Sequence, residues 1–342
     1  MSRLAPPPLG DGSPIDPTKA VLSATLKHTA PLLGCRFDPT GDHVFAGGQD
    51  NAVVRWKVAG GKPTVFAGHK SWVRGLAFAA KERLVLSADY AGRVIAWPAD
   101  AAAPAPRWQV DAHQGWVRAL AVSPDGQTLA SCGNDGLVRL WSLPDGKPVR
   151  TLSGHDCHVY NVLFHPDGRS LVSADLKGKL KHWDVARGAV IRDLDAAVLH
   201  KYDATFAADI GGVRGMAFDP AGKLLACAGI TNVSNAFAGV GNPLVVLFDW
   251  DAGKLRLQLK PKAAFQGTAW GVAFHPQGFI LAAGGGNGGA LWAWRPTDAT
   301  AFHTLAVPTN ARDLALHPAG RLAAVACADG AVRLVDLTGK KG

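Results

Sequence analysis

The stretch "WVRALAVSPDGQTLASCGNDGLVRLW" (residues 116–141) alternates apolar and polar residues in short runs that are separated by Pro-Asp-Gly and Asp-Gly. A period of two is typical of half-buried β-strands, and Asp-Gly between two such runs is a strong signal of a tight turn. The stretch therefore predicts three consecutive antiparallel strands, the third of which ends at Trp141.

The same pattern occurs seven times in the 342-residue chain. The units open at an apolar residue and close at a large apolar one. The opening residues are Leu32, Val73, Val117, Val159, Val213, Ala269 and Ala311, and the closing residues are Trp56, Trp97, Trp141, Trp183, Phe248, Trp294 and Val335. Five of the seven units span 24 positions, the sixth spans 25 and the fifth spans 35. Another short strand between units, such as "KPVRTLSG" (147–154), completes a four-stranded repeat of about 42 residues.

With Gly-His before the first strand and Trp at the end of the third, the repeat resembles that of the WD40 family. This resemblance covers residues 20–338 and implies an all-β fold, a seven-bladed β-propeller of four-stranded antiparallel blades. We expect blade openings near residues 31, 72, 116, 158, 212, 268 and 310, a flexible leader over 1–19 and a tail over 339–342. In this family an N-terminal strand, here "AVLSATLK" (20–27), completes the last blade, and such closure removes an exposed sheet edge.

Composition narrows the class of protein further. The net charge of +9 leaves anionic partners open, and five scattered cysteines without a C-x-x-C pair indicate reduced thiols. The longest apolar runs have the length of strands, and the N-terminus has no apolar core of a signal peptide. We therefore expect a cytoplasmic, monomeric ring that does not interact with membranes.

The segment "GHDCHVYNVLFHPDG" (154–168) has the residue types of a metal site or of half a catalytic pair. The repeat favours another explanation. His155 occupies the Gly-His position of the family, and His165 lies in a turn that recurs as "FHPQG" (274–278) and "LHPAG" (316–320). Only His158 and Cys157 remain, too few for a zinc site. We predict no metal, no cofactor and no catalytic residues.

The resemblance implies a structural hydrogen-bonded tetrad of His, Ser or Thr, Asp and Trp in each blade. The third blade has the complete set, namely His113, Ser131, Asp135 and Trp141. The first offers His28, Asp50 and Trp56. In the second and fourth blades, Ala91 and Lys177 stand where the Asp belongs, and the last three blades lack most of the set.

In this family, the residues that flank each opening position, and the residue before the Asp position, lie around the top face near the central channel. We predict that they bind a partner. The candidates are Trp72, Arg74, Tyr90, Trp116, Arg118, Asn134, His158, Tyr160, Arg214, Trp270 and Arg312. Trp, Tyr and Arg are enriched at binding hot spots. The alternative is that these tryptophans pack between blades and the arginines face solvent.

Two long connections, "DLDAAVLHKYDATFAADIGG" (193–212) and "ITNVSNAFAGVGN" (230–242), are expected to emerge together on this face. The predicted function is a non-catalytic scaffold for protein–protein interaction that binds an acidic or phosphorylated segment. A propeller that binds nucleic acid or a phosphorylated ligand is the alternative, to which "KGKLKHW" (177–183) and "KLRLQLKPK" (254–262) would contribute unless they are merely solvated. An enzyme with its site in the channel is a third, remote alternative.

Overall fold

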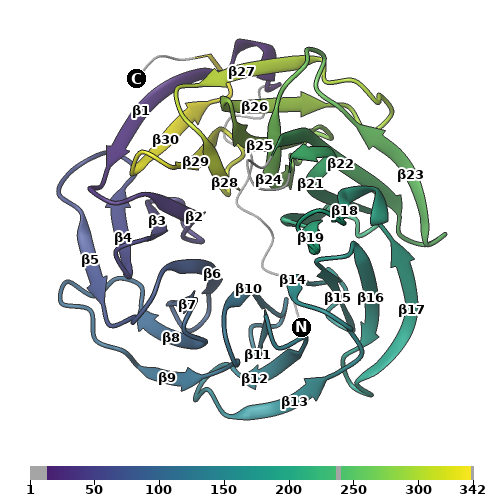
Figure 1. The fold of residues 1–342 in the computed structure, drawn as a ribbon. Helices are drawn as coiled ribbons and strands as arrows, with labels where there is room; N and C mark the ends of the chain where they lie inside the picture. The colour runs from purple at the N-terminus through teal and green to yellow at the C-terminus, as the bar shows by residue number, and fades with distance from the viewer. Residues whose placement is uncertain (1–13, 236–239, 340–342) are drawn as a thin grey trace.

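A computed structural model describes residues 14–235 and 240–339 of the chain. Within them, seven four-stranded antiparallel sheets stand around a central channel as the blades of a propeller (Figure 1). The predicted fold class and the number of blades are confirmed. The first four blades each take four consecutive strands, which are β2 (Leu32–Phe37), β3 (His43–Gly48), β4 (Ala52–Lys57) and β5 (Thr64–Ala67); β6 (Val73–Ala79), β7 (Leu84–Asp89), β8 (Arg93–Pro98) and β9 (Trp108–Asp111); β10 (Val117–Val122), β11 (Thr128–Gly133), β12 (Val138–Ser142) and β13 (Pro148–Leu152); and β14 (Val159–Phe164), β15 (Ser170–Asp175), β16 (Lys179–Asp184) and β17 (Ala189–Asp195).

The last three blades follow the same order. Their strands are β20 (Gly215–Phe218), β21 (Leu224–Asn235), β22 (Val240–Asp249) and β23 (Lys254–Leu259); β24 (Gly267–Phe274), β25 (Ile280–Gly286), β26 (Gly288–Trp294) and β27 (His303–Val307); and β28 (Ala311–Leu316), β29 (Leu322–Cys327) and β30 (Ala331–Asp336) with β1 (Val21–Lys27). The first strand of each blade lines the channel, and the fourth lies at the rim (Figure 1).

The core is divided into seven clusters, each of which lies between two neighbouring blades. The second strand of a blade is covered on both faces, so it is buried at nearly every position in most blades. Strand β7, for example, is buried throughout, whereas four of the five residues of the rim strand β13 are exposed. Burial on both faces thus explains why the apolar/polar alternation of the sequence is weak in the second strands.

Two contacts close the ring between the first and last blades. Strand β1 pairs with β30 in antiparallel register, from Val21 opposite Asp336 to Lys27 opposite Ala331, as the sequence predicts. Inside the channel, Arg36 Nη1 of β2 donates to Asp313 Oδ2 of β28 at 2.6 Å. Ring closure therefore involves one contact at the rim and one at the channel wall. Both contacts would be lost in an open ring.

Residues 1–13 of the predicted leader and 340–342 of the predicted tail lie outside the described residues. The rest of the leader is docked on the propeller. Asp16 caps the short 3₁₀-helix η1 (Pro17–Lys19), Ile15 packs against the core between the sixth and seventh blades, and the Ile15 backbone amide donates to Gln277 Oε1 at 2.7 Å. The segment therefore contacts the propeller from residue 15 onward.

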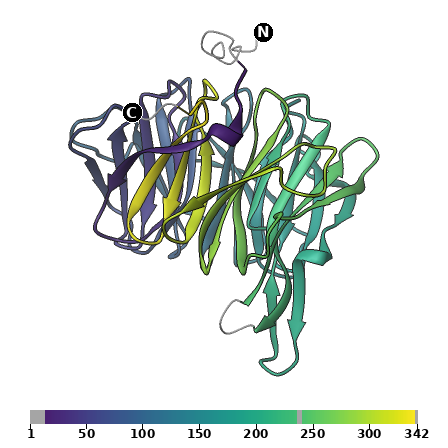
Figure 2. The ribbon, with the colours of Figure 1, turned by 90° about the horizontal axis from the view of Figure 1, so that it is seen from above.

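The two long connections lie together on one face of the disc. The first contains the 3₁₀-helix η2 (Ala197–Leu199) and a hairpin of β18 (His200–Asp203) and β19 (Ala208–Gly211), and the second is the extended end of the β21–β22 hairpin. Lys201 Nζ donates to the Val233 carbonyl at 2.6 Å, which ties them to each other. Figure 2 shows both projecting from the same side of the propeller.

Candidate functional site: the mouth of the central channel

The third blade contains the hydrogen-bonded set that the sequence predicts. His113 contacts Asp135 Oδ1 through Nδ1 at 2.8 Å and the Ser131 hydroxyl through Nε2 at 2.7 Å, while Trp141 Nε1 donates to the same hydroxyl at 2.9 Å. The Ser131 side chain is fully buried. This arrangement resembles a Ser-His-Asp triad in composition, but its serine is not accessible to a substrate.

The prediction that the second and fourth blades lack the aspartate is wrong. Asp89 and Asp175, each two residues earlier than Ala91 and Lys177, accept from the blade histidine instead. Asp89 Oδ2 lies 2.9 Å from His69 Nδ1, and Asp175 Oδ2 lies 2.9 Å from His155 Nδ1. Both carboxylates lie at the end of the second strand of their blade. The blade histidine can therefore contact an aspartate at the strand end, as here, or two residues later, as Asp135 shows.

These aspartates are buried but remain ionised. Burial opposes the charged form of Asp89 and Asp175, yet hydrogen bonds from the histidine and from backbone amides outweigh it and lower the pKa of both carboxyls. Asp135 behaves in the same way, with Arg139 as a further donor. The ends of the second strands are therefore fixed near the channel mouth by charged, well-partnered groups.

We call the hydrogen-bonded set of histidine, aspartate, serine and tryptophan the brace of a blade. The first blade has a reduced version of the brace, because Ala46 stands where blades two to four have the serine. His28 approaches Asp50 through Nε2 rather than Nδ1, at 2.6 Å. In the seventh blade no histidine takes part, and Asp329 pairs with Arg333, whose Nη2 lies 2.5 Å from Asp329 Oδ2.

The histidines of the recurring turns connect neighbouring blades. His165 Nε2 donates to the Gly222 carbonyl at 3.0 Å, His275 Nε2 to that of Gly320 at 2.9 Å, and His317 Nε2 to that of Gly41 at 3.1 Å. The last of these bonds joins the seventh blade to the first, and the partner glycine has a positive φ in each case. Sequence reasoning identified a turn preference here but missed the contact between blades.

Nothing among the described residues forms a group of three or more His, Cys, Asp and Glu side chains that could hold a metal ion. Cys157 is half-buried, the other four cysteines are buried, and all five are free thiols. The apparent cluster in "GHDCHVYNVLFHPDG" is thus divided, with His155 in the blade brace and His165 in the contact between blades.

A β-bulge in the innermost strand positions the predicted partner-binding residues. In six blades the register shifts by one residue directly after the opening position, and the extra residues are Leu33, Arg74, Arg118, Tyr160, Trp270 and Arg312. Bulges re-aim side chains and are common beside functional sites. Here the bulge occurs at the same place in each of these blades, so it delivers a set of arginine and aromatic side chains to the channel mouth.

These side chains form a continuous arc in which guanidinium groups and aromatic rings alternate. We call it the channel-mouth cluster, and its members are Arg74, Tyr90, Trp116, Arg118, Tyr160, Arg214, Trp270 and Arg312. Arg118 Cζ lies 4.3 Å from the ring centroids of both Trp116 and Tyr160, and Arg214 Cζ lies 4.6 Å from the centroid of Tyr160.

Trp270 connects three blades across the channel. The Cζ atoms of Arg74, Arg214 and Arg312 lie 5.2, 5.1 and 6.0 Å from its ring centroid. Guanidinium groups over aromatic faces are attracted by the ring quadrupole. The cluster is therefore held by cation–π contacts rather than by ion pairs.

Its positive charge is not neutralised locally. Within residues 14–235 and 240–339, none of the four arginines of the cluster forms an ion pair with a carboxylate. Burial lowers the pKa of Arg118, and burial together with the neighbouring Arg74 and Arg118 lowers that of Arg214 to about 10. The guanidiniums of Arg118 and Arg214 thus stay charged at neutral pH.

On the outer side, the cluster continues into an exposed aromatic platform. Tyr90 and Trp116 stack in parallel with centroids 3.9 Å apart, and Trp72 lies 6.1 Å from Tyr90. Trp72 and Trp116 are 44% and 39% exposed. The idea that these two tryptophans are buried between blades therefore does not fit the structure, whereas Trp270 is half-buried and packs against the arginines.

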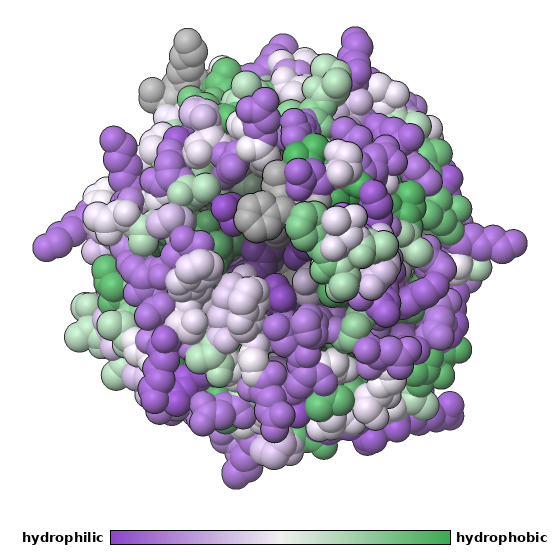
Figure 3. Space-filling view, viewed as in Figure 1, coloured by the Kyte–Doolittle hydropathy of each residue, from purple (hydrophilic) through white to green (hydrophobic). Residues whose placement is uncertain are grey.

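Asn134 and His158 are placed differently. Asn134 Oδ1 accepts from Arg118 Nε at 2.7 Å, so it orients the central arginine of the arc. His158 is half-buried, and burial followed by the charge of Arg118 lowers its pKa. The structure brings all eleven predicted residues to one end of the channel. The face shown in Figure 3 is hollowed at its centre, where hydrophilic residues gather.

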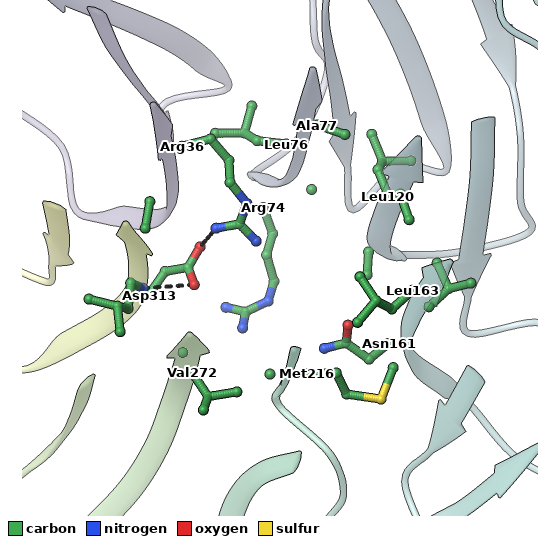
Figure 4. A pocket seen from close by; sticks show the side chains of 18 of the residues that line it. Arg36, Arg74, Leu76, Ala77, Leu120, Asn161, Leu163, Met216, Val272 and Asp313 are labelled. Atoms are coloured by element: carbon green, nitrogen blue, oxygen red, sulfur yellow. Dashed lines mark hydrogen bonds and ion pairs between the residues drawn. The ribbon is translucent and has the colours of Figure 1, made fainter. Parts of the chain in front are cut away.

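Sequence reasoning missed the polar residues further inside the channel. Arg36, Asn161 and Asp313 line a cavity of about 440 Å³ enclosed by the innermost strands (Figure 4). Asp313 accepts from the Cys35 amide at 3.1 Å as well as from Arg36. The bulge shifts the alternation of the strand by one residue, which a sequence pattern with a fixed period of two does not reveal.

Comparison with known proteins agrees with this geometry. The model of the family described as "WD domain, G-beta repeat" matches residues 20–57, 60–97, 105–142 and 146–184. These matches extend from β1 to β16, which includes the first four blades apart from β17, and the remaining three blades repeat the same four-stranded arrangement. The chain therefore contains WD40 repeats and folds as a seven-bladed β-propeller.

Curated relatives are similar over short segments. They include the small ribosomal subunit protein RACK1 of Caenorhabditis elegans, 50% identical over 13% of this chain and 14% of that protein. Periodic tryptophan protein 2 of Arabidopsis thaliana is 32% identical over 34% of this chain and 13% of its own length. The ribosome biogenesis protein WDR12 homolog of Chlamydomonas reinhardtii is 30% identical over 34% of this chain and 28% of its own. The chain thus matches less than a third of each of these relatives.

Proposed function

We propose that the protein is a non-catalytic interaction scaffold that captures a segment of another protein on the channel-mouth cluster and the adjoining aromatic platform. The observation that carries this proposal is the combination of two exposed tryptophans with four charged arginines that have no carboxylate partner among the described residues. Aromatic and arginine side chains at a rigid, concave centre are the usual anchors of protein interfaces.

Guanidiniums that lack a carboxylate partner among the described residues indicate the chemistry of the captured segment. Arginine binds carboxylate and phosphate oxygens through two parallel hydrogen bonds. An acidic or phosphorylated segment therefore fits the cluster better than a neutral one, and the aromatic platform would hold an apolar side chain next to it.

The names of the relatives support a role in assemblies, since one is a ribosomal subunit protein and another a ribosome biogenesis protein. None of the described helices is long and apolar enough to cross a membrane. A cytoplasmic location and a monomeric ring remain part of the proposal.

The proposal is tested by pull-down with quantitative mass spectrometry, comparing the wild type with the double variant Trp116→Ala/Arg118→Glu. We expect the double variant to lose the specific partners because it removes an exposed anchor and reverses the central charge of the arc. A control on the rim, Val149→Ala/Arg150→Glu, makes matched changes on β13 and should keep them. Partners retained by a well-folded double variant would contradict the proposal.

Binding of nucleic acid is the second candidate function, and the stacked Tyr90–Trp116 pair beside Arg118 is the observation that favours it. Stacking platforms with arginine bind single strands with a steep dependence on salt. A change of several orders of magnitude in affinity between 50 and 200 mM salt would favour this candidate, whereas a peptide anchored by Trp116 should respond modestly.

A further inference from the structure

The central channel contains a cavity beneath the channel-mouth cluster. The cavity has a volume of about 440 Å³, within the range of sites that hold small organic molecules. Its wall includes residues from both ends of the innermost strands, for example Arg74 and Phe78 of β6. It therefore runs along the channel below the surface on which a partner segment would dock.

The wall of this cavity has a polar and an apolar part. Figure 4 shows Arg74 and Asn161 pointing into the cavity, with Leu76, Leu120, Met216 and Val272 around them. Arg118 and Arg214 line it as well. A ligand with one anionic group and an apolar body would contact both parts.

The charges of the lining residues are unbalanced. Four arginines, Arg36, Arg74, Arg118 and Arg214, face one carboxylate, Asp313. Asp313 is already engaged, because Arg36 Nη1 lies 2.6 Å from its Oδ2. Three guanidiniums from three different blades thus converge on the cavity without a carboxylate partner among the described residues.

One of these guanidiniums has a buried polar atom without a partner in the described part of the chain. Arg214 Nε is inaccessible to solvent there and has no hydrogen-bond acceptor among those residues. Asn161 Nδ2 donates to the Arg214 carbonyl at 3.1 Å, which fixes the Asn161 amide beside it. Buried unpaired donors cost free energy, and they are kept where a ligand or solvent satisfies the group.

We propose that the channel binds a small organic phosphate ester, whose phosphoryl group is held by Arg74, Arg118 and Arg214 and whose apolar body lies against Leu76, Leu120 and Met216. A phosphate monoester carries nearly two negative charges at neutral pH, so it neutralises the three unpaired guanidiniums further than a carboxylate does. Its three terminal oxygens also match donors that approach from three blades.

This site is distinct from the docking surface, although the two share arginines. The exposed tryptophans of the aromatic platform do not line the cavity, and Met216 lines the cavity without being part of the cluster. The inference therefore goes beyond the proposed function and can fail without it.

The test is isothermal titration calorimetry of the full chain with phenyl phosphate, benzoate and phenol as probes. We expect phenyl phosphate to bind at least 10-fold more tightly than benzoate, and phenol to show no binding. Arg74→Gln and Arg214→Gln should each lower the affinity for phenyl phosphate by at least 10-fold, because each removes one phosphate contact. The matched control Arg150→Gln removes the same charge from the rim strand β13 and should change the affinity by less than 2-fold.

A second variant tests the cavity itself. Met216→Trp fills the space with a larger apolar side chain and should abolish phenyl phosphate binding. If its thermal melt shows that it does not fold, the smaller Met216→Phe takes its place. No binding of phenyl phosphate at millimolar concentration would overturn the proposal, as would binding that is unchanged in Arg74→Gln and in the Met216 variant. Equal affinities for benzoate and phenyl phosphate would overturn the assignment of a phosphate ester as the ligand.

The platform variant Trp72→Ala separates this proposal from the docking proposal. Loss of partner capture with phenyl phosphate still bound would leave both in place. A protein that captures its partner but binds no phenyl phosphate, with or without this substitution, would overturn the channel site alone.

Discussion

Blades two to four and blades five to seven share the same four-stranded antiparallel order but are stabilised differently. In the former, a buried histidine joins an ionised aspartate and a serine, and a tryptophan donates to that serine, as in the set around His69 and Asp89. In the sixth blade the corresponding space is filled by rings. Trp292 packs over Gly284, where an added Cβ would lie 2.7 Å from the ring, and against Phe265 with centroids 5.1 Å apart.

The comparison shows that the propeller does not require its polar brace. What the seven blades share is the strand order and the apolar cluster between neighbours. The matches of the family model fall on the four blades in which a histidine contacts an aspartate. The model thus detects the blades that carry brace residues, whereas blades five to seven have the same strand order without being matched. Ring closure connects the two halves, because β1 and the turn histidine of the seventh blade join the apolar half to the braced one.

The largest effect is expected from breaking that connection. Deletion of residues 1–28 removes β1, leaves β30 as an open edge and exposes the cluster around Leu26. We expect loss of cooperative unfolding and the appearance of aggregates, since an unpaired strand is a template for association. Thermal melting and light scattering measure this. An unchanged melting temperature without aggregation would count against the role of β1.

A smaller effect is expected from removing one brace. Asp175→Ala leaves His155 and the Lys177 and Lys179 amides without their acceptor, and should lower the free energy of unfolding by about 2–4 kcal/mol. The matched change Lys177→Ala, at the position aligned with Asp135, should cost less than about 0.5 kcal/mol. Chemical denaturation measures both, and equal effects would show that the acceptor is assigned to the wrong residue.

The smallest effect is expected at the junction between the two halves. His182 of the fourth blade packs against Trp250 of the fifth with ring centroids 4.4 Å apart, and both of its ring nitrogens are buried without a hydrogen-bond partner within residues 14–235 and 240–339. Burial, followed by the charges of Arg192 and His165, lowers its pKa from 6.5 to about 4.

Below pH 6.5 the unfolded chain takes up a proton that folded His182 does not, so its contribution to stability is lost as the pH falls from 6.5 to 4. In His182→Leu the decline over this range should be smaller by on the order of 1–2 kcal/mol, because the variant has no imidazole at this position to take up a proton. Denaturation at pH 7, 5.5 and 4.5 measures this difference. A variant whose decline parallels that of the wild type would contradict the assignment.

Much of the fold followed from sequence because each blade repeats one pattern of turns and closing aromatic residues. The residues at the channel mouth could also be named, since they have a fixed position relative to the opening residue. The bulge that directs Arg118 and Tyr160 into one arc could not be inferred from the sequence. It shifts the register of the strand by a single residue, and no residue type or spacing in the sequence marks that shift. For the same reason the pair of Arg36 and Asp313, 277 positions apart, became visible only in the closed ring.

The most direct test of the account is the affinity of the strongest recovered partner segment for the wild type and for Trp116→Ala/Arg118→Glu, both shown to be folded by thermal melting. Loss of an exposed aromatic anchor and reversal of a central charge should weaken binding by about 30-fold or more. The rim control Val149→Ala/Arg150→Glu should bind within 2-fold of the wild type. Equal affinity of the wild type and the double variant would contradict the claim that the channel mouth is where partners bind.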